Sequence, residues 1–390
     1  MTSRKAFEDR LAATLNELRG AGLMRQMRLP GGLDLVSNDY LGLAEHPYIR
    51  ESMSASLADL PAGSGGSRLL RGHHEIFARI EARLASFTGS EAALLFGSGY
   101  AANIGLLQSI VSPDDVIVSD ARNHASLIDG IRLTKAATVI YPHQDMDALE
   151  AALLRPRNGR AVVITESVFS MDGDLTPLRE VCEIAERNGA VVIVDEAHAT
   201  GMYGSRGSGR VEELGLRDRV AATMHTGGKA LGSGGAWVAG SRALCNVMVN
   251  RARAFIFSTA PLPVLAVALG AGLDLVEREP ERRREVHRKS SLLRRALGEA
   301  GITCGGESMI VPIIVGANDA ALEIQSMLAA AGFDVRAIRP PSVPAGTARL
   351  RVTVRYPVSD GDLLRFAAVL GSDPRTVRGS DPAQELSRIR

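Results

Sequence analysis

The stretch Ala190-Val-Val-Ile-Val-Asp195 decides the fold class, because it is a short run of β-branched residues that ends in an acidic side chain. Four similar runs precede it along the chain. They are mostly apolar instead of alternating, as expected of strands covered on both faces. Helical segments separate the runs, so the sequence predicts an α/β protein with a mostly parallel sheet flanked by helices. The four other runs are Ala92-Ala-Leu-Leu-Phe96, Asp115-Val-Ile-Val-Ser-Asp120, Ala137-Thr-Val-Ile-Tyr141 and Ala161-Val-Val-Ile-Thr165.

Outside these runs, two further parts are expected. Phe7, Leu11, Leu15 and Leu18 recur at helical spacing and indicate an N-terminal helical arm without a core of its own. A helical stretch over about 262–300, broken near Pro280, leads into a smaller α+β unit with strands over 309–315, 333–338 and 349–354. We therefore expect an arm over 1–44, a large domain over 45–275 and a small C-terminal domain over 276–390. The polar tail after Asp373 is expected to fray.

Composition narrows the classes of function. The 390 residues are 45% hydrophobic and 23% charged, and 45 Lys+Arg against 44 Asp+Glu give a net charge of +1. That balance offers no general attraction for nucleic acid or an anionic membrane, so a small-molecule partner is expected. The first ten residues include Glu8 and Asp9 and lack an apolar segment, which favours a cytoplasmic protein without a signal peptide. Cys182, Cys245 and Cys304 are odd in number and far apart, so neither a disulfide framework nor a metal site is expected.

A glycine-rich turn, Gly97-Ser-Gly-Tyr-Ala-Ala-Asn103, follows the run that ends at Phe96 and opens a helix. Free backbone N–H groups at such a turn can hold a phosphate. This segment also matches the G-x-G-x-x-A pattern of dinucleotide-binding turns, but the chain lacks the supporting acidic residue after a second strand. A monophosphate cradle, a plain turn and a dinucleotide site all stay open on this motif alone.

Two further features stand at strand ends. Asp195 closes its apolar run and His198 follows three residues later, so the carboxylate is either satisfied by the backbone or paired with a cation such as a protonated heterocycle. Lys229 lies in the Gly-flanked loop Met224-His-Thr-Gly-Gly-Lys-Ala-Leu-Gly232, where Thr223 and Ala230 break the Walker A pattern. An ordinary solvated lysine is possible, but this setting also suits a lysine that forms a Schiff base.

Together, a lysine for an aldehyde, a carboxylate for a ring nitrogen and N–H donors for a phosphate indicate pyridoxal 5'-phosphate. Longer motifs extend the pattern over nearly the whole chain, and on them the protein resembles the α-oxoamine synthases, which are fold-type I pyridoxal phosphate transferases. Besides Asp195–His198, the motifs are Ser37-Asn-Asp-Tyr-Leu-Gly-Leu43, Gly63-Ser-Gly-Gly-Ser-Arg-Leu-Leu70, Asn123-His-Ala-Ser126, Thr165-Glu-Ser-Val-Phe-Ser-Met-Asp-Gly-Asp174 and Pro344-Ala-Gly-Thr-Ala-Arg-Leu-Arg-Val-Thr353.

The resemblance implies an acyltransferase that condenses an amino acid with an acyl thioester and releases CO2 and the carrier thiol. The segment Val343-Pro-Ala-Gly-Thr-Ala-Arg-Leu-Arg351 is most similar to the family member that joins L-alanine to pimeloyl-CoA or pimeloyl-acyl carrier protein. Glycine-using relatives tend to read Gly-Thr-Arg where this chain has Gly66-Ser67-Arg68. A member that uses glycine or serine with another acyl-CoA stays the alternative.

Residue roles are implied by the same resemblance. Lys229 would carry the cofactor and then act as the general base, while Asp195 would keep the ring nitrogen protonated. His124 would stack on the ring, although its position is also typical of a polar residue that begins a helix. The remaining expected contacts are His198 and Ser170 at the ring hydroxyl, Thr226 with Ser98, Gly99 and Tyr100 at the phosphate, and Asn38 and Arg351 at the substrate.

The family builds its active site at a homodimer interface. Ser258 and Thr259 would therefore reach the phosphate in the partner subunit, although a capped turn before a helix explains them equally well from the residues alone. We expect a homodimer whose substrates are an amino acid and a thioester, without nucleic acid, membrane or metal.

The chain departs from the family pattern at three places, namely Gly227-Gly228, Arg71-Gly-His-His74 and Arg355-Tyr-Pro-Val-Ser-Asp360. These changes concern the acyl-binding side, where Arg71 would engage a distal carboxylate or merely solvate a loop.

Two other classes of function compete with the acyltransferase interpretation. A dinucleotide-dependent oxidoreductase would leave Asp195 and Lys229 without roles, and a non-catalytic pyridoxal phosphate binder would not need Arg351.

Overall fold

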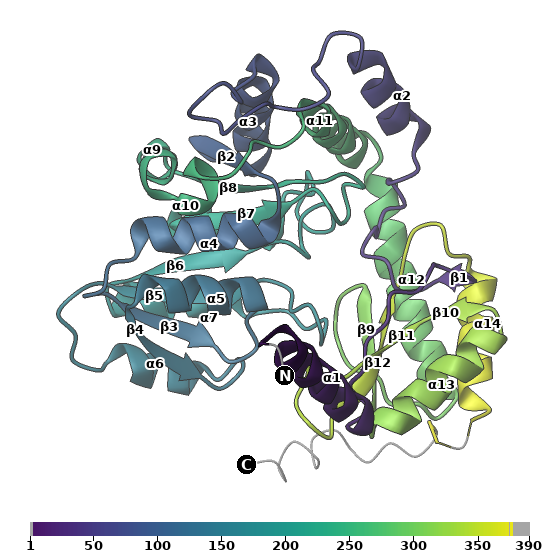
Figure 1. The fold of residues 1–390 in the computed structure, drawn as a ribbon. Helices are drawn as coiled ribbons and strands as arrows, with labels where there is room; N and C mark the ends of the chain where they lie inside the picture. Colours follow the sequence, from purple (N-terminus) through teal and green to yellow (C-terminus); the bar gives the residue numbers. More distant parts are fainter. Residues whose placement is uncertain (1–2, 374, 377–390) are drawn as a thin grey trace.

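The computed structural model describes residues 3–373 and 375–376. Its largest sheet has the strand order β2-β8-β7-β6-β5-β3-β4 (Figure 1). All its pairings are parallel except those that β8 makes with β2 and β7. The predicted mostly parallel sheet is therefore confirmed. The strands are β2 (Ala92–Phe96), β3 (Val116–Asp120), β4 (Ala137–Tyr141), β5 (Ala161–Glu166), β6 (Ala190–Asp195), β7 (Ala222–Thr226) and β8 (Ala236–Gly240).

Strands β7 and β8 are not among the predicted runs, and β8 is the one antiparallel member of this sheet. Residues 227–235 join it to β7, a connection too short for the helical crossover that a parallel neighbour would require. The short return holds Lys229 directly above the sheet edge. The loop that carries this lysine is thus fixed at both ends by paired strands.

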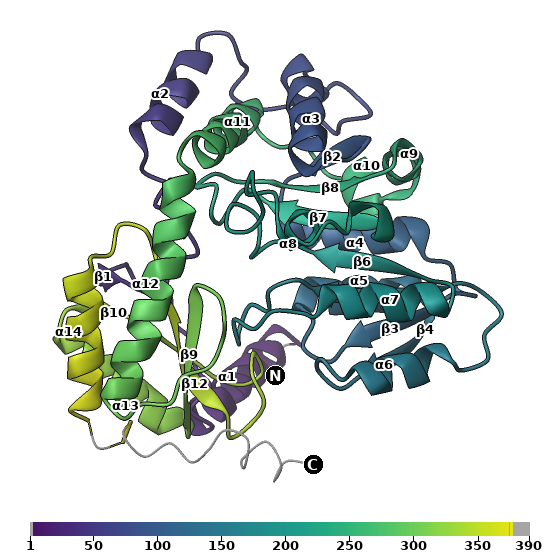
Figure 2. The same ribbon diagram turned by 180° about the vertical axis from the view of Figure 1, so that it is seen from behind.

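Helices cover both faces of the sheet because the apolar strands present side chains to each side in turn (Figures 1 and 2). On β5, Val162 and Ile164 face one group of helices, whereas Val163 faces the other. The first group is α4 (Gly99–Ile110), α5 (Ala125–Thr134), α9 (Arg242–Arg251) and α10 (Arg253–Ile256). The second is α6 (Met146–Leu153), α7 (Leu178–Arg187) and α8 (Arg210–Glu213), near the 3-10 turn Arg217–Arg219.

A second unit is built on a three-stranded antiparallel sheet in the order β11-β12-β9. Helices α12, α13 and α14 pack around it, and α11 leads into it from the large sheet (Figure 1). This is the α+β architecture expected of the C-terminal part. The elements are α11 (Pro263–Arg278), α12 (Pro280–Glu299), β9 (Ile310–Gly316), α13 (Asn318–Ala330), β11 (Arg336–Ile338), β12 (Ala348–Thr353) and α14 (Asp360–Gly371).

The single strand predicted over 333–338 is wrong in one respect. The segment divides into β10 (Phe333–Asp334) and β11, because the two halves pair with different partners. Strand β10 runs parallel to β1 (Leu33–Asp34), whereas β11 pairs with β12. The N-terminal region is thereby attached to the C-terminal unit, and the expected domain boundaries at 44 and 275 stay predictions.

The predicted N-terminal helix is confirmed as α1 (Ser3–Gly20), which buries no residue. Helices α2 (Pro47–Ser56) and α3 (Glu75–Thr88) follow and pack with α11 beside the β2 end of the sheet. Among the described helices, none has the length and apolar character needed to cross a membrane. The tail expected to fray lies, apart from 373 and 375–376, outside the described residues.

Candidate active site

The predicted chemical residues gather at one edge of the large sheet. Strands β2, β3, β5, β6 and β7 all end at this edge, since they run in the same direction. Ligands bind at the carboxyl ends of strands in open parallel sheets. The residues found there are Gly97 after β2, His124 after β3, Glu166 at the end of β5, Asp195 at the end of β6, and Thr226 and Lys229 at and after the end of β7.

Lys229 is partly buried, and its Nζ atom lies 2.7 Å from Nε2 of His198. Burial lowers the pKa of the lysine to about 8, against the opposing attraction of the Asp195 carboxylate. Burial and then the lysine charge lower the pKa of His198 well below its usual value, so this imidazole is neutral. A substantial fraction of neutral amine is therefore available at mildly alkaline pH, as a nucleophile or base requires.

Tyr40 is a site residue to which no role was given from the sequence, although it lies in the quoted motif over 37–43. Its hydroxyl is 2.6 Å from Nδ1 of His198 and also donates to Oδ1 of Asn38 at 3.2 Å. The side chain is fully buried, and burial raises the pKa of Tyr40 to about 12. The phenol thus stays protonated and fixes the orientation of the His198 ring.

Asp195 is buried and is held only by neutral donors. Its Oδ1 atom accepts from the backbone N–H of Ala197 at 2.8 Å, and Oδ2 accepts from the amide of Asn103 at 2.8 Å. Asn103 in turn donates to the hydroxyl of Ser126 at 2.9 Å. Within residues 3–373 and 375–376 the carboxylate forms no ion pair, which is costly for a buried charge unless a ligand supplies the cation.

Glu166 stands beside Asp195 because the two residues are register partners on β5 and β6. Its side chain is buried, and its Oε1 atom has no hydrogen-bond partner among the described residues. Burial, and then the Asp195 carboxylate, raise the pKa of Glu166 well above its usual value. The raised pKa favours the protonated, neutral form of Glu166. Its position within the motif over 165–174 was visible in the sequence, but its side-chain environment was not.

The turn after β2 forms the amino end of helix α4. The Ser98 hydroxyl accepts from the N–H of Ala101 at 3.2 Å, while the first helical N–H groups, those of Gly99 and Tyr100, have no intrahelical acceptor. A Cβ added at Gly97 would meet no atom within 4 Å, so this side of the turn is open. Exposed N–H donors beside open space fit an anionic group.

Arg351 lies on β12 of the C-terminal unit and is buried. Its Nε donates to the carbonyl of Ser170 at 2.6 Å, Nη2 to Oδ1 of Asn38 at 3.0 Å and Nη1 to Thr353 at 3.0 Å. The guanidinium therefore joins three segments that are far apart in sequence. Of the predicted substrate residues, Asn38 and Arg351 are brought together.

A cavity of about 730 Å³ lies between the ends of β3 and β5 and the C-terminal unit. His124 and Ser170 are part of its wall, together with Arg122, Asp172 and Arg349. The Nδ1 atom of His124 lies 2.8 Å from the Ser126 hydroxyl at the start of α5. The cavity extends the site away from Lys229 and offers room for a substrate chain.

Other predicted residues lie outside this cluster in a single chain. Ser258 and Thr259 are exposed, and Phe257 before them has 71% of its surface accessible. Arg71 is exposed in a loop and, among the described residues, forms no hydrogen bond or ion pair with its side chain. Their predicted roles therefore stay predictions.

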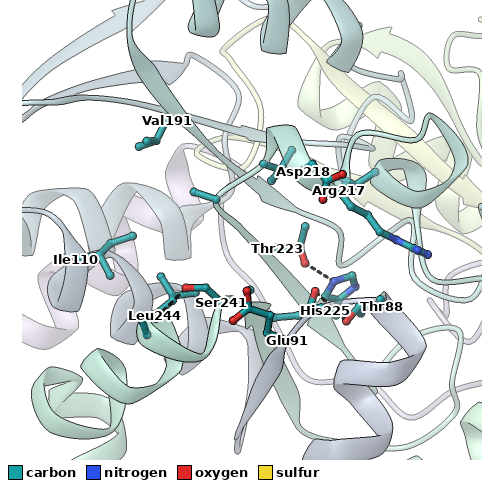
Figure 3. A pocket seen from close by; sticks show the side chains of 18 of the residues that line it. Thr88, Glu91, Ile110, Val191, Arg217, Asp218, Thr223, His225, Ser241 and Leu244 are labelled. Carbon is teal, nitrogen blue, oxygen red and sulfur yellow. Dashed lines mark hydrogen bonds between the residues drawn. The ribbon is translucent and has the colours of Figure 1, made fainter.

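A second cavity, of about 590 Å³, opens at the opposite edge of the sheet (Figure 3). Glu91, Arg217 and His225 are part of its lining. His225 lies 2.7 Å from the Thr223 hydroxyl, and none of the predicted site residues lines this cavity. We call it the back cavity.

Comparison with known proteins agrees with this arrangement. The model of the aminotransferase class I and II family matches residues 30–370. The 8-amino-7-oxononanoate synthase of Geobacter sulfurreducens is 44% identical over 378 residues, covering 92% of this chain and 96% of that protein. The enzyme of the same name from Mycolicibacterium smegmatis is 42% identical over 365 residues, with 92% and 95% covered.

Solved structures share the fold. Serine palmitoyltransferase from S. paucimobilis, with a bound PLP–myriocin aldimine, superposes with a TM-score of 0.88 at 26% identity and covers 97% of this chain and 99% of its own. The 8-amino-7-oxononanoate synthase of Francisella tularensis gives a TM-score of 0.77 at 24% identity, with 87% and 97% covered. On the match over residues 30–370 and the identity to these relatives, the chain belongs to the aminotransferase class I and II family.

Proposed function

We propose that the protein is a pyridoxal phosphate-dependent acyltransferase that condenses L-alanine with a pimeloyl thioester. The products would be 8-amino-7-oxononanoate, CO2 and the free thiol of coenzyme A or acyl carrier protein, a step of biotin biosynthesis. The observation that carries the proposal is the buried Asp195 carboxylate, which forms no ion pair among the described residues, in a chain 42–44% identical to synthases of that name.

The residues present fit the cofactor. Asp195 supplies a buried anion for a protonated ring nitrogen, and Lys229 supplies an amine whose pKa is lowered to about 8. The turn at Gly97, Ser98, Gly99 and Tyr100 supplies backbone N–H donors for a phosphate. We assign Thr226 to the same group, although its hydroxyl donates to the carbonyl of Gly235 at 3.1 Å in the free chain. We assign His124 to the face of the ring and His198 with Ser170 to its hydroxyl. A dinucleotide would leave the first two of these features unused.

Bound pyridoxal phosphate supplies an aldehyde that reacts with amines and a ring that stabilises negative charge on the α-carbon of an amino acid. Lys229, as a neutral amine, would remove the α-proton of alanine and later return a proton to the product. Asp195 would hold the proton on the ring nitrogen, because its own position without a cation favours a positive partner. Arg351 and Asn38 would orient the alanine carboxylate.

The exposed surface supports a homodimer. Helix α1 presents Phe7, Leu11, Leu15 and Leu18, which are between 38% and 56% exposed, and Phe257 is exposed directly before Ser258 and Thr259. A second copy that covered Phe257 would also lie against Ser258 and Thr259, as a shared active site requires. We propose this homodimer, with shared active sites, as the active form, and the cytoplasm as its location.

A glycine- or serine-using α-oxoamine synthase is the second candidate, favoured by the TM-score of 0.88 with serine palmitoyltransferase. Sequence identity decides against it, since the synthases named above are 42–44% identical and the palmitoyltransferase is 26% identical.

The test is a matrix of amino acids against acyl thioesters, scored by release of the thiol from the cofactor-loaded protein. We expect the highest kcat/KM for L-alanine with a pimeloyl thioester and no thiol release without an amino acid. Faster turnover of serine or glycine, or of a long uncharged acyl chain, would replace the proposal with the second candidate.

A further inference from the structure

The cavity beside His124 and Ser170 is mostly apolar, with charge confined to one cluster. Its charged lining consists of Arg122, Asp172 and Arg349, which carry a net charge of +1. Partial burial lowers the pKa of His124, so that ring adds no charge at neutral pH. The apolar part of the lining consists of Ala121, Ala125, Ile128, Phe169, Met171, Ile314, Pro341, Val343 and Pro344.

Asp172 lies between two guanidinium groups, but the two are not equivalent. Arg349 is buried, and besides pairing with Asp172 it donates from Nε and Nη2 to the carbonyl and hydroxyl of Thr347 at 3.1 and 3.2 Å. Arg122 pairs with Asp172 through Nη1 at 3.1 Å, and its side chain is 35% exposed. Among the described residues its other guanidinium nitrogens have no acceptor, so Arg122 can receive a second anion.

The backbone of Arg122 is held firmly. Its N–H donates to Oδ1 of Asp120 at 2.8 Å, and the amide of Asn123 donates to Ser119 and to the carbonyl of Ile164. These bonds fix the loop after β3 to β3 itself and to β5. The Arg122 side chain therefore starts from a rigid base, which reduces the entropy lost when it binds a ligand.

We propose that Arg122 binds the carboxylate at the far end of the acyl chain and so sets the preference for a dicarboxylic substrate. This inference rests on the proposed function, because 8-amino-7-oxononanoate has its ketone at carbon 7 and a carboxylate at carbon 1. The apolar wall of the cavity that holds both His124 and Arg122 suits a methylene chain. A monoanionic tail neutralises the +1 charge of the cluster, and the free nitrogens of Arg122 offer a planar fork to a carboxylate.

Arg71, the residue predicted from the sequence for this carboxylate, does not line the cavity. The two arginines therefore make different predictions, and their variants can be compared directly.

The experiment measures kcat/KM for pimeloyl and heptanoyl thioesters in the parent enzyme and in Arg122→Gln, Arg122→Lys, Arg71→Ala and Arg132→Gln. Arg132 is the matched control, since it lies on α5 with a side chain 76% exposed and does not line the cavity. We expect Arg122→Gln to lose roughly 10- to 100-fold of the preference for pimeloyl, mainly through KM, which matches the worth of a charged hydrogen bond. Arg122→Lys should lose less, and Arg132→Gln should keep the parent preference.

Calorimetric binding of pimelate separates this inference from the proposed function. If the parent fails to condense alanine with the pimeloyl thioester, the proposed function falls, whereas weaker pimelate binding by Arg122→Gln would still support the arginine. Unchanged preference and unchanged pimelate binding in that variant would overturn the inference. An equal loss of kcat/KM for both thioesters in Arg122→Gln would also overturn the inference, because it would place Arg122 at the carrier. A loss of the pimeloyl preference confined to Arg71→Ala would overturn it as well.

Discussion

Both edges of the large sheet carry buried polar side chains, but the two edges differ in whether those side chains have partners. At the back cavity, the buried His225 lies 2.9 Å from the Thr200 hydroxyl and 2.7 Å from that of Thr223, and it stacks on Trp237 with a ring separation of 5.0 Å. Among the described residues, no buried side chain of that lining leaves a polar atom without a partner. At the carboxyl edge, Asp195 forms no ion pair among the described residues and Glu166 keeps an unpartnered oxygen.

The two edges differ in how much interaction free energy a ligand can still gain. Saturated polar groups gain nothing from a ligand, whereas buried groups left unpaired gain the interaction that folding did not supply. Cavity size alone would not separate the two edges, since both volumes exceed 500 Å³. The two edges are separated by whether their buried polar groups have hydrogen-bond or ion-pair partners.

The largest expected effect comes from removing the amine at the carboxyl edge. Lys229→Ala should lower kcat by at least about 10²- to 10⁴-fold, because it removes the general base and the attachment point of the cofactor. Glu91→Gln at the back cavity is the matched variant and should stay within about twofold of the parent. Both kcat values are measured by thiol release. A similar loss of kcat in the two variants would contradict the assignment of catalysis to the carboxyl edge.

The next largest effect concerns the unpaired carboxylate. Asp195→Asn keeps the shape but removes the negative charge, so kcat should fall by at least about 100-fold while the circular dichroism spectrum and Tm change little. Parental kcat in this variant would mean that Asp195 serves only the structure, through Asn103 and Ala197.

A smaller effect is expected at the substrate carboxylate. Arg351→Lys retains the charge but loses the planar fork, so KM for alanine should rise about tenfold. KM for the thioester should change much less. Steady-state kinetics with each substrate varied in turn make this measurement, and a rise confined to the thioester would move Arg351 to the acyl end.

The smallest effect on catalysis is expected at His143, which supports the site from behind. Its ring nitrogens lie 2.8 Å from Asp120 and 2.5 Å from Asp174. Burial opposes the charged ring, but the hydrogen bonds to both carboxylates prevail and raise the pKa of His143 to about 9. Because the folded pKa is raised, this stabilisation is complete below pH 6.5 and is lost as pH rises from about 6.5 to 9.

Chemical unfolding of His143→Gln at a series of pH values tests this. The shift corresponds to about 3 kcal/mol of unfolding free energy at pH 6, and the gap between parent and variant should shrink by pH 9. A gap independent of pH would show that His143 contributes packing against Phe169 and not charge.

Much of this site could be predicted from local sequence. Asp195 ends an apolar strand, and Lys229 lies in a glycine-flanked loop directly after one. Both positions at the sheet edge follow from the neighbouring residues in the sequence. The antiparallel β8 was missed because the direction of a strand depends on its connection and not on its own residues. Tyr40, Asn103 and Glu166 lie within quoted motifs, yet their roles come from partners far away in sequence.

The acyl end shows the same limit more sharply. Arg122 and Arg71 are both exposed arginines in loops, and nothing local distinguishes them. Arg122 and Arg349 meet only through Asp172 in the loop after β5, which pairs with both. Ser258 and Thr259 depend on a second chain, so one sequence and one chain leave their role as a prediction.

The central claim is that Lys229 at the carboxyl edge holds pyridoxal phosphate. The most direct measurement is to add the cofactor to the purified protein, reduce with borohydride and locate the label by peptide mass mapping. We expect one phosphopyridoxyl group per chain, on Lys229, and none in Lys229→Ala. A label on another lysine, or no label at saturating cofactor, would contradict it.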